Sequence, residues 1–172
     1  EITKMIENLD IRFTNEIYSL YEWKNGIQQI DNYTFGERWI FPLGMFISLE
    51  DSIEAYKYYV GKDEYWTKSM FMLFESGGGE MYLINCDLKS PMDGMIFKHS
   101  VGALEYDVII SAYDSLESFL ITIIQCLKQN VFYFDENIKV LFSADSKKEI
   151  EISKKYNPKS ELLKISWSCF KV

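Results

Sequence analysis

His99 is the only histidine in the chain, so any histidine-based chemistry has to use it. The pairing to test is with Cys86, because a thiol beside an imidazole is an activated nucleophile. If residues 87–93 connect two strands of a hairpin, residue 86 faces residue 94 and Met81 faces His99. That register separates Cys86 from His99 by about 16 Å along the strand. We therefore expect His99 to be a strand residue that faces solvent or Met81, and not a catalytic group.

No other group of reactive residues forms a recognisable catalytic or metal-binding motif. The glycines at 77–79 precede a strand-like stretch without Gly-Lys-Ser/Thr, so they predict a hairpin turn and not a phosphate-binding loop. Adjacent acids usually point apart, which argues against catalytic pairs at Glu50-Asp51, Asp63-Glu64 and Asp135-Glu136. The widely spaced cysteines argue against a zinc site and a disulfide framework: Cys86, Cys126 and Cys169. We therefore expect no catalytic residue, no metal and no cofactor.

Apolar spacing and turn residues predict the elements that would position these side chains. Strands are expected at residues 69–75, 80–86, 95–99 and 107–112, in a meander, with a later strand at 138–142. Helices are expected at 3–9, 15–25, 48–59, 114–127 and 147–156, with an irregular stretch at 27–44 and a final amphipathic piece ending at Trp167. The pattern predicts an α+β fold in which residues 1–172 form one domain, with a mostly antiparallel meander sheet covered by helices.

The helix at 114–127 has the most regular apolar spacing. Asp114 and Glu117 form a capping-box pattern at its start. Six apolar side chains then repeat at helical spacing, and we expect them to be buried across the sheet: Leu116, Phe119, Leu120, Ile123, Ile124 and Leu127.

The charge distribution is asymmetric. The 172-residue chain has a net charge of −8, with −11 over residues 1–120 (20 acids, 9 bases) and +3 over residues 121–172 (6 acids, 9 bases). A nucleic-acid binder would show clustered lysine and arginine instead. An acidic body suits a basic protein partner, although the same charge also serves solubility alone.

Targeting signals are not evident in the sequence. No run approaches the roughly 18 apolar residues of a membrane span, and the first residues lack the basic and apolar segments of a secretion signal. The odd number of separated cysteines fits a reducing compartment. We expect a cytoplasmic protein that binds neither membrane nor nucleic acid.

The helix at 15–25 leads into an Asn25-Gly26 pair. Thr14 or Asn15 is placed to cap the helix, and Gly26 is placed to adopt the left-handed conformation that often ends one. We expect Trp23, on the same helix, to pack against the core.

Three stretches together resemble the SUKH superfamily, the cell-wall-synthesis-regulator-like domains of yeast that bacteria use as toxin-immunity proteins. They are residues 20–26, with Trp23, Asn25 and Gly26 as matching positions, residues 72–83 around the glycine turn, and residues 112–120 at a helix start. Tyr113-Asp114 departs from the pair of small hydroxyl residues expected there. The resemblance implies a binding protein without catalysis. Bacterial members neutralise toxins, often nucleases, by direct binding, and eukaryotic relatives regulate wall synthesis.

The resemblance and the acidic charge predict a cytoplasmic immunity protein that binds a cognate, basic, nuclease-type toxin. The alternative is a regulatory scaffold for an endogenous protein or small ligand. The residues expected to contact the partner are acids beside the sheet and one aromatic anchor: Glu64, Trp66, Glu75, Glu80, Asp87 and Asp93. For each of them, a solvated edge position is the competing interpretation.

Overall fold

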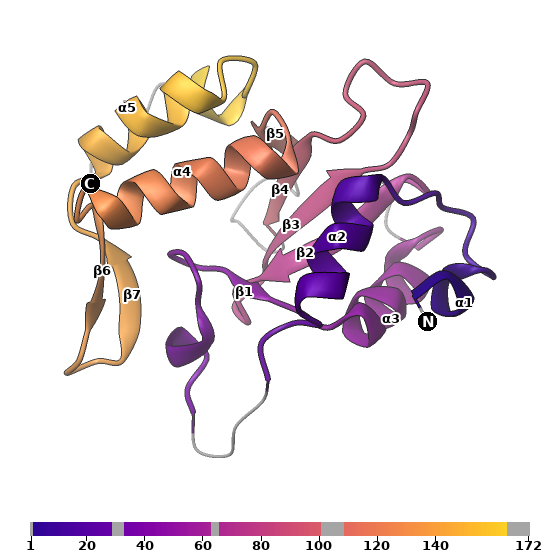
Figure 1. The fold of residues 1–172 in the computed structure, drawn as a ribbon, viewed down its shortest axis with the longest axis horizontal. Coiled ribbons are helices and arrows are strands. Elements are labelled where there is room, and N and C mark those ends of the chain that lie inside the picture. The colour runs from indigo at the N-terminus through magenta and orange to yellow at the C-terminus, as the bar shows by residue number, and fades with distance from the viewer. Residues whose placement is uncertain (1, 29–32, 63–65, 101–108, 165–172) are drawn as a thin grey trace.

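The computed structural model describes residues 2–28, 33–62, 66–100 and 109–164. The elements follow one another along the chain as shown in Figure 1. The helices are α1 (Ile2–Ile6), α2 (Asn15–Trp23), α3 (Leu49–Tyr59), α4 (Leu116–Lys128) and α5 (Ser146–Tyr156), with 3-10 turns η1 (Gly36–Arg38) and η2 (Leu162–Lys164). The strands are β1 (Met45–Phe46), β2 (Met70–Glu75), β3 (Glu80–Asn85), β4 (Ile96–Ser100), β5 (Ile109–Tyr113), β6 (Phe132–Asp135) and β7 (Val140–Ser143).

Strands β1 to β5 form one antiparallel sheet in chain order, which confirms the predicted α+β meander. The predicted register of β3 and β4 is also confirmed, because Met81 pairs with His99. His99 itself is fully buried, so the expectation that it could face solvent is wrong. Between β2 and β3, Gly77 and Gly79 have positive φ angles, a conformation that glycine adopts at little cost in a tight reversal.

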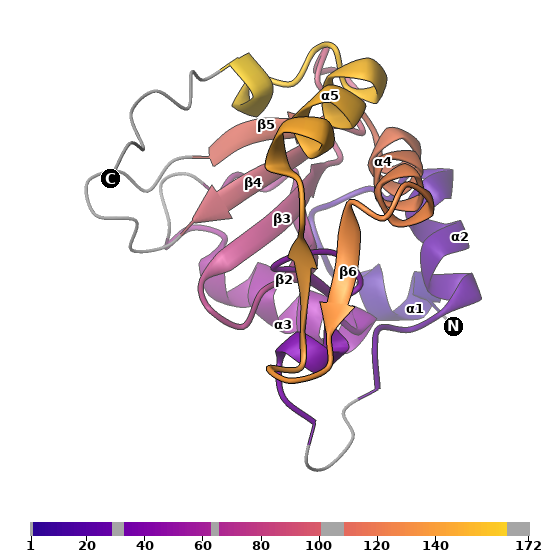
Figure 2. The ribbon, with the colours of Figure 1, turned by 90° about the vertical axis from the view of Figure 1, so that its left-hand side faces the viewer.

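Both faces of the sheet are buried. Phe71 and Leu73 of β2 join the cluster formed with α2 and α4, which lie over the same face in Figures 1 and 2. Met70 and Met72 alternate with them and join a second, methionine-rich cluster that includes Trp66 and Phe97. Alternate strand residues point to opposite faces, so burial on both sides explains why β2 reads as an unbroken apolar run.

Helix α4 differs from its predicted pattern at both ends. Its N-cap is Ser115, which forms a reciprocal capping box with Ser118, so the prediction of Asp114 and Glu117 in these roles is wrong. The Asp114 carboxylate instead accepts from the backbone N–H of Lys159. The prediction of six buried side chains is wrong for Ile124 and Leu127, which are 46% and 44% exposed. Leu116, Phe119 and Ile123 are buried, and Leu120 packs partly buried beside them.

The start of α4 is tied to α5 through the buried side chain of Asn157. Its Nδ2 donates to the Thr122 hydroxyl (2.9 Å) and to the Ser153 carbonyl (3.0 Å). Its Oδ1 accepts from the Ser118 hydroxyl (2.7 Å) and from the backbone N–H of Asp114 (3.1 Å). A buried amide with all these bonds fixes the angle between the two helices.

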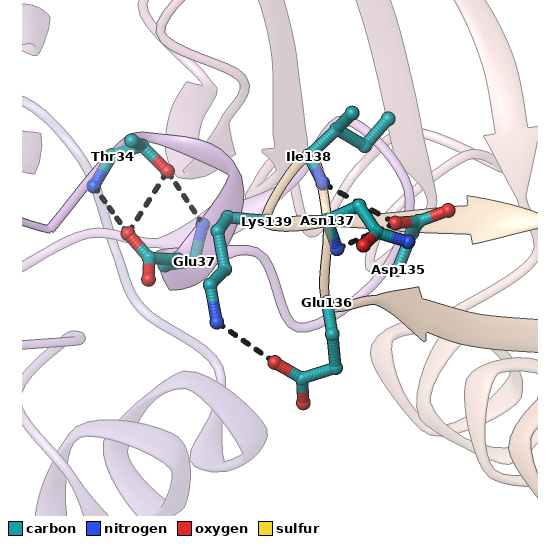
Figure 3. Close-up of polar contacts among 7 residues, drawn as sticks. All are labelled: Thr34, Glu37, Asp135, Glu136, Asn137, Ile138 and Lys139. Atoms are coloured by element: carbon teal, nitrogen blue, oxygen red, sulfur yellow. Dashed lines mark hydrogen bonds and ion pairs between the residues drawn. The ribbon is translucent and has the colours of Figure 1, made fainter.

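Strands β6 and β7 form a separate hairpin, of which sequence analysis predicted only the second strand. In its turn the Asp135 carboxylate accepts from the backbone N–H groups of Asn137 (2.8 Å) and Ile138 (3.2 Å), and Lys139 pairs with Glu136 at 2.8 Å (Figure 3). Asp135 and Glu136 thus belong to the turn of this hairpin.

The hairpin packs against the η1 segment, where Glu37 accepts from the backbone N–H and the hydroxyl of Thr34 (Figure 3). A Cβ added to Gly36 would lie 2.1 Å from the Val140 side chain, so the contact requires glycine.

The remaining predicted boundaries are right to within a few residues. Helix α1 ends at Ile6, α2 ends at Trp23, and α5 begins at Ser146 with Asp145 as its N-cap. Thr14 occupies the N-cap position of α2, but its side chain makes no capping bond. Of the final piece expected to end at Trp167, η2 is described and residues 165–167 lie outside the described residues.

Candidate functional site

Asn25 and Gly26 follow α2 and link it to the start of α3 by direct contact, although η1 and β1 lie between the two helices in the chain. The Asn25 Oδ1 accepts from the backbone N–H of Leu49 (2.7 Å), and its Nδ2 donates to the Glu50 carboxylate (2.8 Å). Gly26 has a φ of +74°, and a Cβ there would lie 2.5 Å from the backbone nitrogen of Ser48. Gly26 is therefore left-handed, as expected, but it lies beyond the C-cap of α2 at Lys24 and serves close packing against the α3 N-terminus.

Trp23, the third motif residue, is 75% exposed, so the expectation that it packs in the core is wrong. It borders a shallow, mostly apolar groove between α2 and α4 that also contains Leu120 and Ile124.

Helix α3, which this connection holds in place, forms one wall of a groove of about 520 Å³. We call it the acidic groove. Its described lining includes three carboxylates and no lysine or arginine: Ile47, Asp51, Glu54, Ala55, Tyr58, Tyr59, Met72, Glu75 and Met81. Asp51, Glu54 and Tyr58 follow one another at helical spacing on a single face of α3, and Glu75 comes from the end of β2.

The carboxylates of the acidic groove are poorly compensated. Within the described part of the chain, Glu54 and Glu75 form no ion pair and accept no side-chain hydrogen bond, whereas Asp51 accepts from the Ser48 hydroxyl (2.6 Å). Burial raises the pKa of the half-buried Glu75, and the nearby Asp51 raises it further, while Arg38 opposes the shift. The charged side chains in the described lining are all carboxylates, and cations near it include Lys62, against the Tyr58 ring, and Arg38.

Aromatic side chains complete the groove. Tyr58 is 60% exposed, and the Lys62 Nζ lies 4.3 Å from its ring centroid. Trp66 is only 2% exposed, stacks on Tyr59 at 4.6 Å and donates its indole N–H to the Met70 carbonyl (3.0 Å). The expectation of Trp66 as a surface anchor is thus wrong, because its ring is packed under the groove, and Tyr58 is the exposed aromatic there.

The predicted contact acids separate into two groups. Glu75 lines the acidic groove, and Glu80, at the start of β3, accepts from the Ser76 hydroxyl (2.8 Å) in the adjacent turn. Asp87 and Asp93 lie in the connection after β3, at the opposite end of that strand, about 17 Å away at strand rise. Glu64 lies outside the described residues.

Asp51, Glu54 and Tyr58 were not among the site residues predicted from the sequence. The helical spacing contained a signal for them, because Asp51, Glu54 and Tyr58 share one face of α3, and the structure buries Ile53 and Tyr56 on another face. Their proximity to Glu75 could not be foreseen, because it depends on how α3 packs against β2.

The described residues offer little for metal or thiol chemistry. No cluster of three or more histidine, cysteine or acidic side chains among them is placed to hold a metal ion. Burial raises the pKa of the Cys86 and Cys126 thiols to about 12, which keeps both protonated at neutral pH. Within the same residues, no helix is both long and apolar enough to cross a membrane.

We expect Glu75→Gln to stabilise the protein at neutral pH. Because the folded-state pKa of Glu75 is raised, the native state binds more protons than the unfolded state between the ordinary value of 4.5 and the raised one, and stability falls as pH rises through that window. Glutamine cannot ionise, so the gain should shrink as pH falls toward 4.5. Urea unfolding of both proteins across this range checks it, with the exposed Glu7→Gln as control. A variant less stable than the parent at neutral pH would contradict the expected repulsion.

Comparison with known proteins agrees with this architecture. The sequence profile of the SMI1/KNR4 family (SUKH-1) matches residues 1–122, well over half of the chain. No curated protein sequence matches the chain significantly. The matched region runs from α1 into α4 and includes the Asn25-Gly26 connection, the acidic groove and the whole five-stranded sheet. The chain therefore belongs to the SMI1/KNR4 family (SUKH-1).

Proposed function

We propose that this protein is a cytoplasmic, non-catalytic immunity protein that neutralises a cognate toxin by binding a basic face of it in the acidic groove. The observation that carries the proposal is the set of three carboxylates, Asp51, Glu54 and Glu75, with no lysine or arginine in the described lining. A nuclease-type toxin must be basic where it holds phosphate, so an acidic groove that covers this site would both bind and block it.

The composition of the groove supports a protein partner. Exposed Tyr58 offers a large flat surface of the kind enriched at interface hot spots, beside charges that steer association. Glu80 lies beside the groove residue Met81 in β3 but is absent from the described lining, so it stays a proposed contact. A partner that spans β3 would also reach Asp87 and Asp93, and Glu64 is proposed on sequence grounds alone.

We expect neutralisation of two groove acids, D51N with E54Q, to weaken toxin capture by roughly tenfold and to reduce its dependence on salt. The tagged full chain is used to capture partners from its native host, identified by mass spectrometry, and the recovered toxin domain is then titrated against each variant. The charge-matched control is E7Q with E151Q, both exposed and absent from the groove lining.

Each outcome separates the alternatives. A basic toxin-domain protein that elutes with salt and binds the groove variant weakly supports the proposal. Unchanged binding by that variant, together with a loss in Trp23→Ala, would move the contact to the apolar groove between α2 and α4. Recovery of host wall-synthesis or signalling proteins instead would favour the regulatory scaffold.

A further inference from the structure

A second pocket, of about 560 Å³, lies between the sheet and α5. Its polar lining comes from three strands and one helix: Tyr82 of β3, Lys98 of β4, Tyr113 of β5, and Ser146, Lys147, Glu149 and Ser153 of α5. Leu43 and Leu162 are among its apolar walls. Figure 2 shows α5 and β5 at the same end of the molecule, and η2 contacts both of them. A volume of this size, with apolar walls and a few convergent polar groups, is typical of small-molecule sites.

Two half-buried, opposite charges, Lys98 and Glu149, face this pocket without an ion pair, whereas the third charged residue of the lining, Lys147, is exposed and stays hydrated. Among the described residues, neither Lys98 nor Glu149 forms an ion pair within 4 Å. The Lys98 Nζ lies 6.0 Å from the Tyr82 ring centroid, and the Ser143 side chain is near Glu149. Lys98 is near enough to affect the ionisation of Glu149. Partly desolvated charges are costly unless each has a partner, so the pocket offers one site for a cation and one for an anion.

Two phenol groups at the same pocket are also unpartnered. Tyr82 is only 6% exposed, yet its hydroxyl makes no hydrogen bond to any described residue, and the Tyr113 hydroxyl makes none either. Their rings are fixed by packing against Phe119, at centroid distances of 6.4 and 4.7 Å. Buried phenols usually find a hydrogen-bond partner, and rings held this firmly present both hydroxyls in fixed positions.

We propose that this pocket binds a small zwitterion with an apolar body, the chemistry of an aromatic or aliphatic α-amino acid. The ligand ammonium pairs with Glu149, its carboxylate pairs with Lys98, and its side chain lies against the leucines. A simple anion would leave Glu149 unpaired and repelled, and a simple cation would do the same to Lys98. This inference uses none of the acidic-groove residues, so it stands apart from the proposed toxin contact.

The experiment compares three probes on the full chain: L-phenylalanine, 3-phenylpropionate, which lacks the ammonium, and 2-phenylethylamine, which lacks the carboxylate. Calorimetric titration should show saturable binding of L-phenylalanine at millimolar concentration or below, and at least about tenfold weaker binding of either analogue. Glu149→Gln should abolish the preference over 3-phenylpropionate, and Lys98→Met the preference over 2-phenylethylamine.

Matched controls keep the test specific. Glu151→Gln on α5 and Lys57→Met on α3 remove the same charges from exposed positions and should leave binding unchanged. The thermal midpoint of each variant shows whether it is folded before titration. Absence of saturable L-phenylalanine binding to the wild-type chain would overturn the proposal, as would equal binding of all three probes. Capture of the toxin by the K98M and E149Q variants is expected to be unaffected, which distinguishes the two sites.

Discussion

Replacing Gly26 with alanine is expected to lower the free energy of unfolding by about 2–5 kcal/mol. Gly26 has a φ of +74°, where an L-residue is strained by about 1–2 kcal/mol. The added Cβ would also lie 2.5 Å from the backbone nitrogen of Ser48 and 2.7 Å from the carbonyl carbon of Ile47. These are backbone atoms at the start of α3, and they cannot move aside as a flexible side chain could. Overpacking of this kind costs a further 1–3 kcal/mol or so.

The control for this variant is Gly61→Ala. Gly61 has a similar φ of +82°, but no heavy atom of the described residues lies within 4 Å of an added Cβ. Gly61→Ala should therefore lower the free energy of unfolding only through backbone strain, by about 1–2 kcal/mol. Urea unfolding at a common pH gives both values, and the difference between them measures the contact with Ser48. Equal losses in the two variants would show that the connection between α2 and α3 is looser than described.

The Gly26→Ala substitution should also affect partner binding. Ser48 is the N-cap of α3, and α3 carries Asp51 and Glu54. A displaced α3 start would shift the groove acids relative to Glu75, so folded Gly26→Ala protein should also capture the proposed partner less tightly. The Asn25-Gly26 motif thus acts by positioning the groove, because Asn25 bonds to α3 backbone and Gly26 packs on it.

The sheet was predictable because its signals are local. Apolar runs separated by glycine or proline turns locate β2, β3 and β4, and counting back from residues 87–93 gives the pairing of Met81 with His99. The burial of His99 was not predictable on the same basis. A residue on one face of a strand is solvent-exposed only if that face of the sheet is uncovered. Here the methionine-rich cluster covers the face on which His99 lies.

The candidate site depended on contacts between distant segments, which the sequence could indicate only in part. Glu75 was identified as an acid beside a turn, but its groove partners come from a helix more than fifteen residues earlier in the chain. Trp23 was predicted to be buried and is exposed, whereas Trp66 was predicted to be a surface anchor and is buried. The position of a single tryptophan in a sequence does not indicate whether its ring lies in the core or at the surface. Ile124 repeats with the buried face of α4, yet it is 46% exposed and lines the groove between α2 and α4.

Replacing Phe119 with alanine should cost about 3–5 kcal/mol. Its side chain is fully buried and lies at the centre of an aromatic cluster drawn from the loop before β1, two strands of the sheet and the end of β5. The ring centroids of four neighbours lie 4.7–6.4 Å away: Phe41, Phe74, Tyr82 and Tyr113. Truncation removes these contacts together and leaves a cavity that rigid aromatic rings cannot refill.

The matched control is Ile124→Ala on the same helix, where the side chain is 46% exposed and a loss below about 1 kcal/mol is expected. Urea unfolding measures both variants. Comparable losses would mean that α4 is held by its exposed face, contrary to the packing described. Phe119→Leu keeps most of the apolar volume, so its loss of unfolding free energy should lie between those of Phe119→Ala and Ile124→Ala. It should also hold the rings of Tyr82 and Tyr113 in place better than Phe119→Ala does.

Because Phe119 fixes both phenols at the second pocket, Phe119→Ala should also weaken L-phenylalanine binding, whereas Ile124→Ala should not.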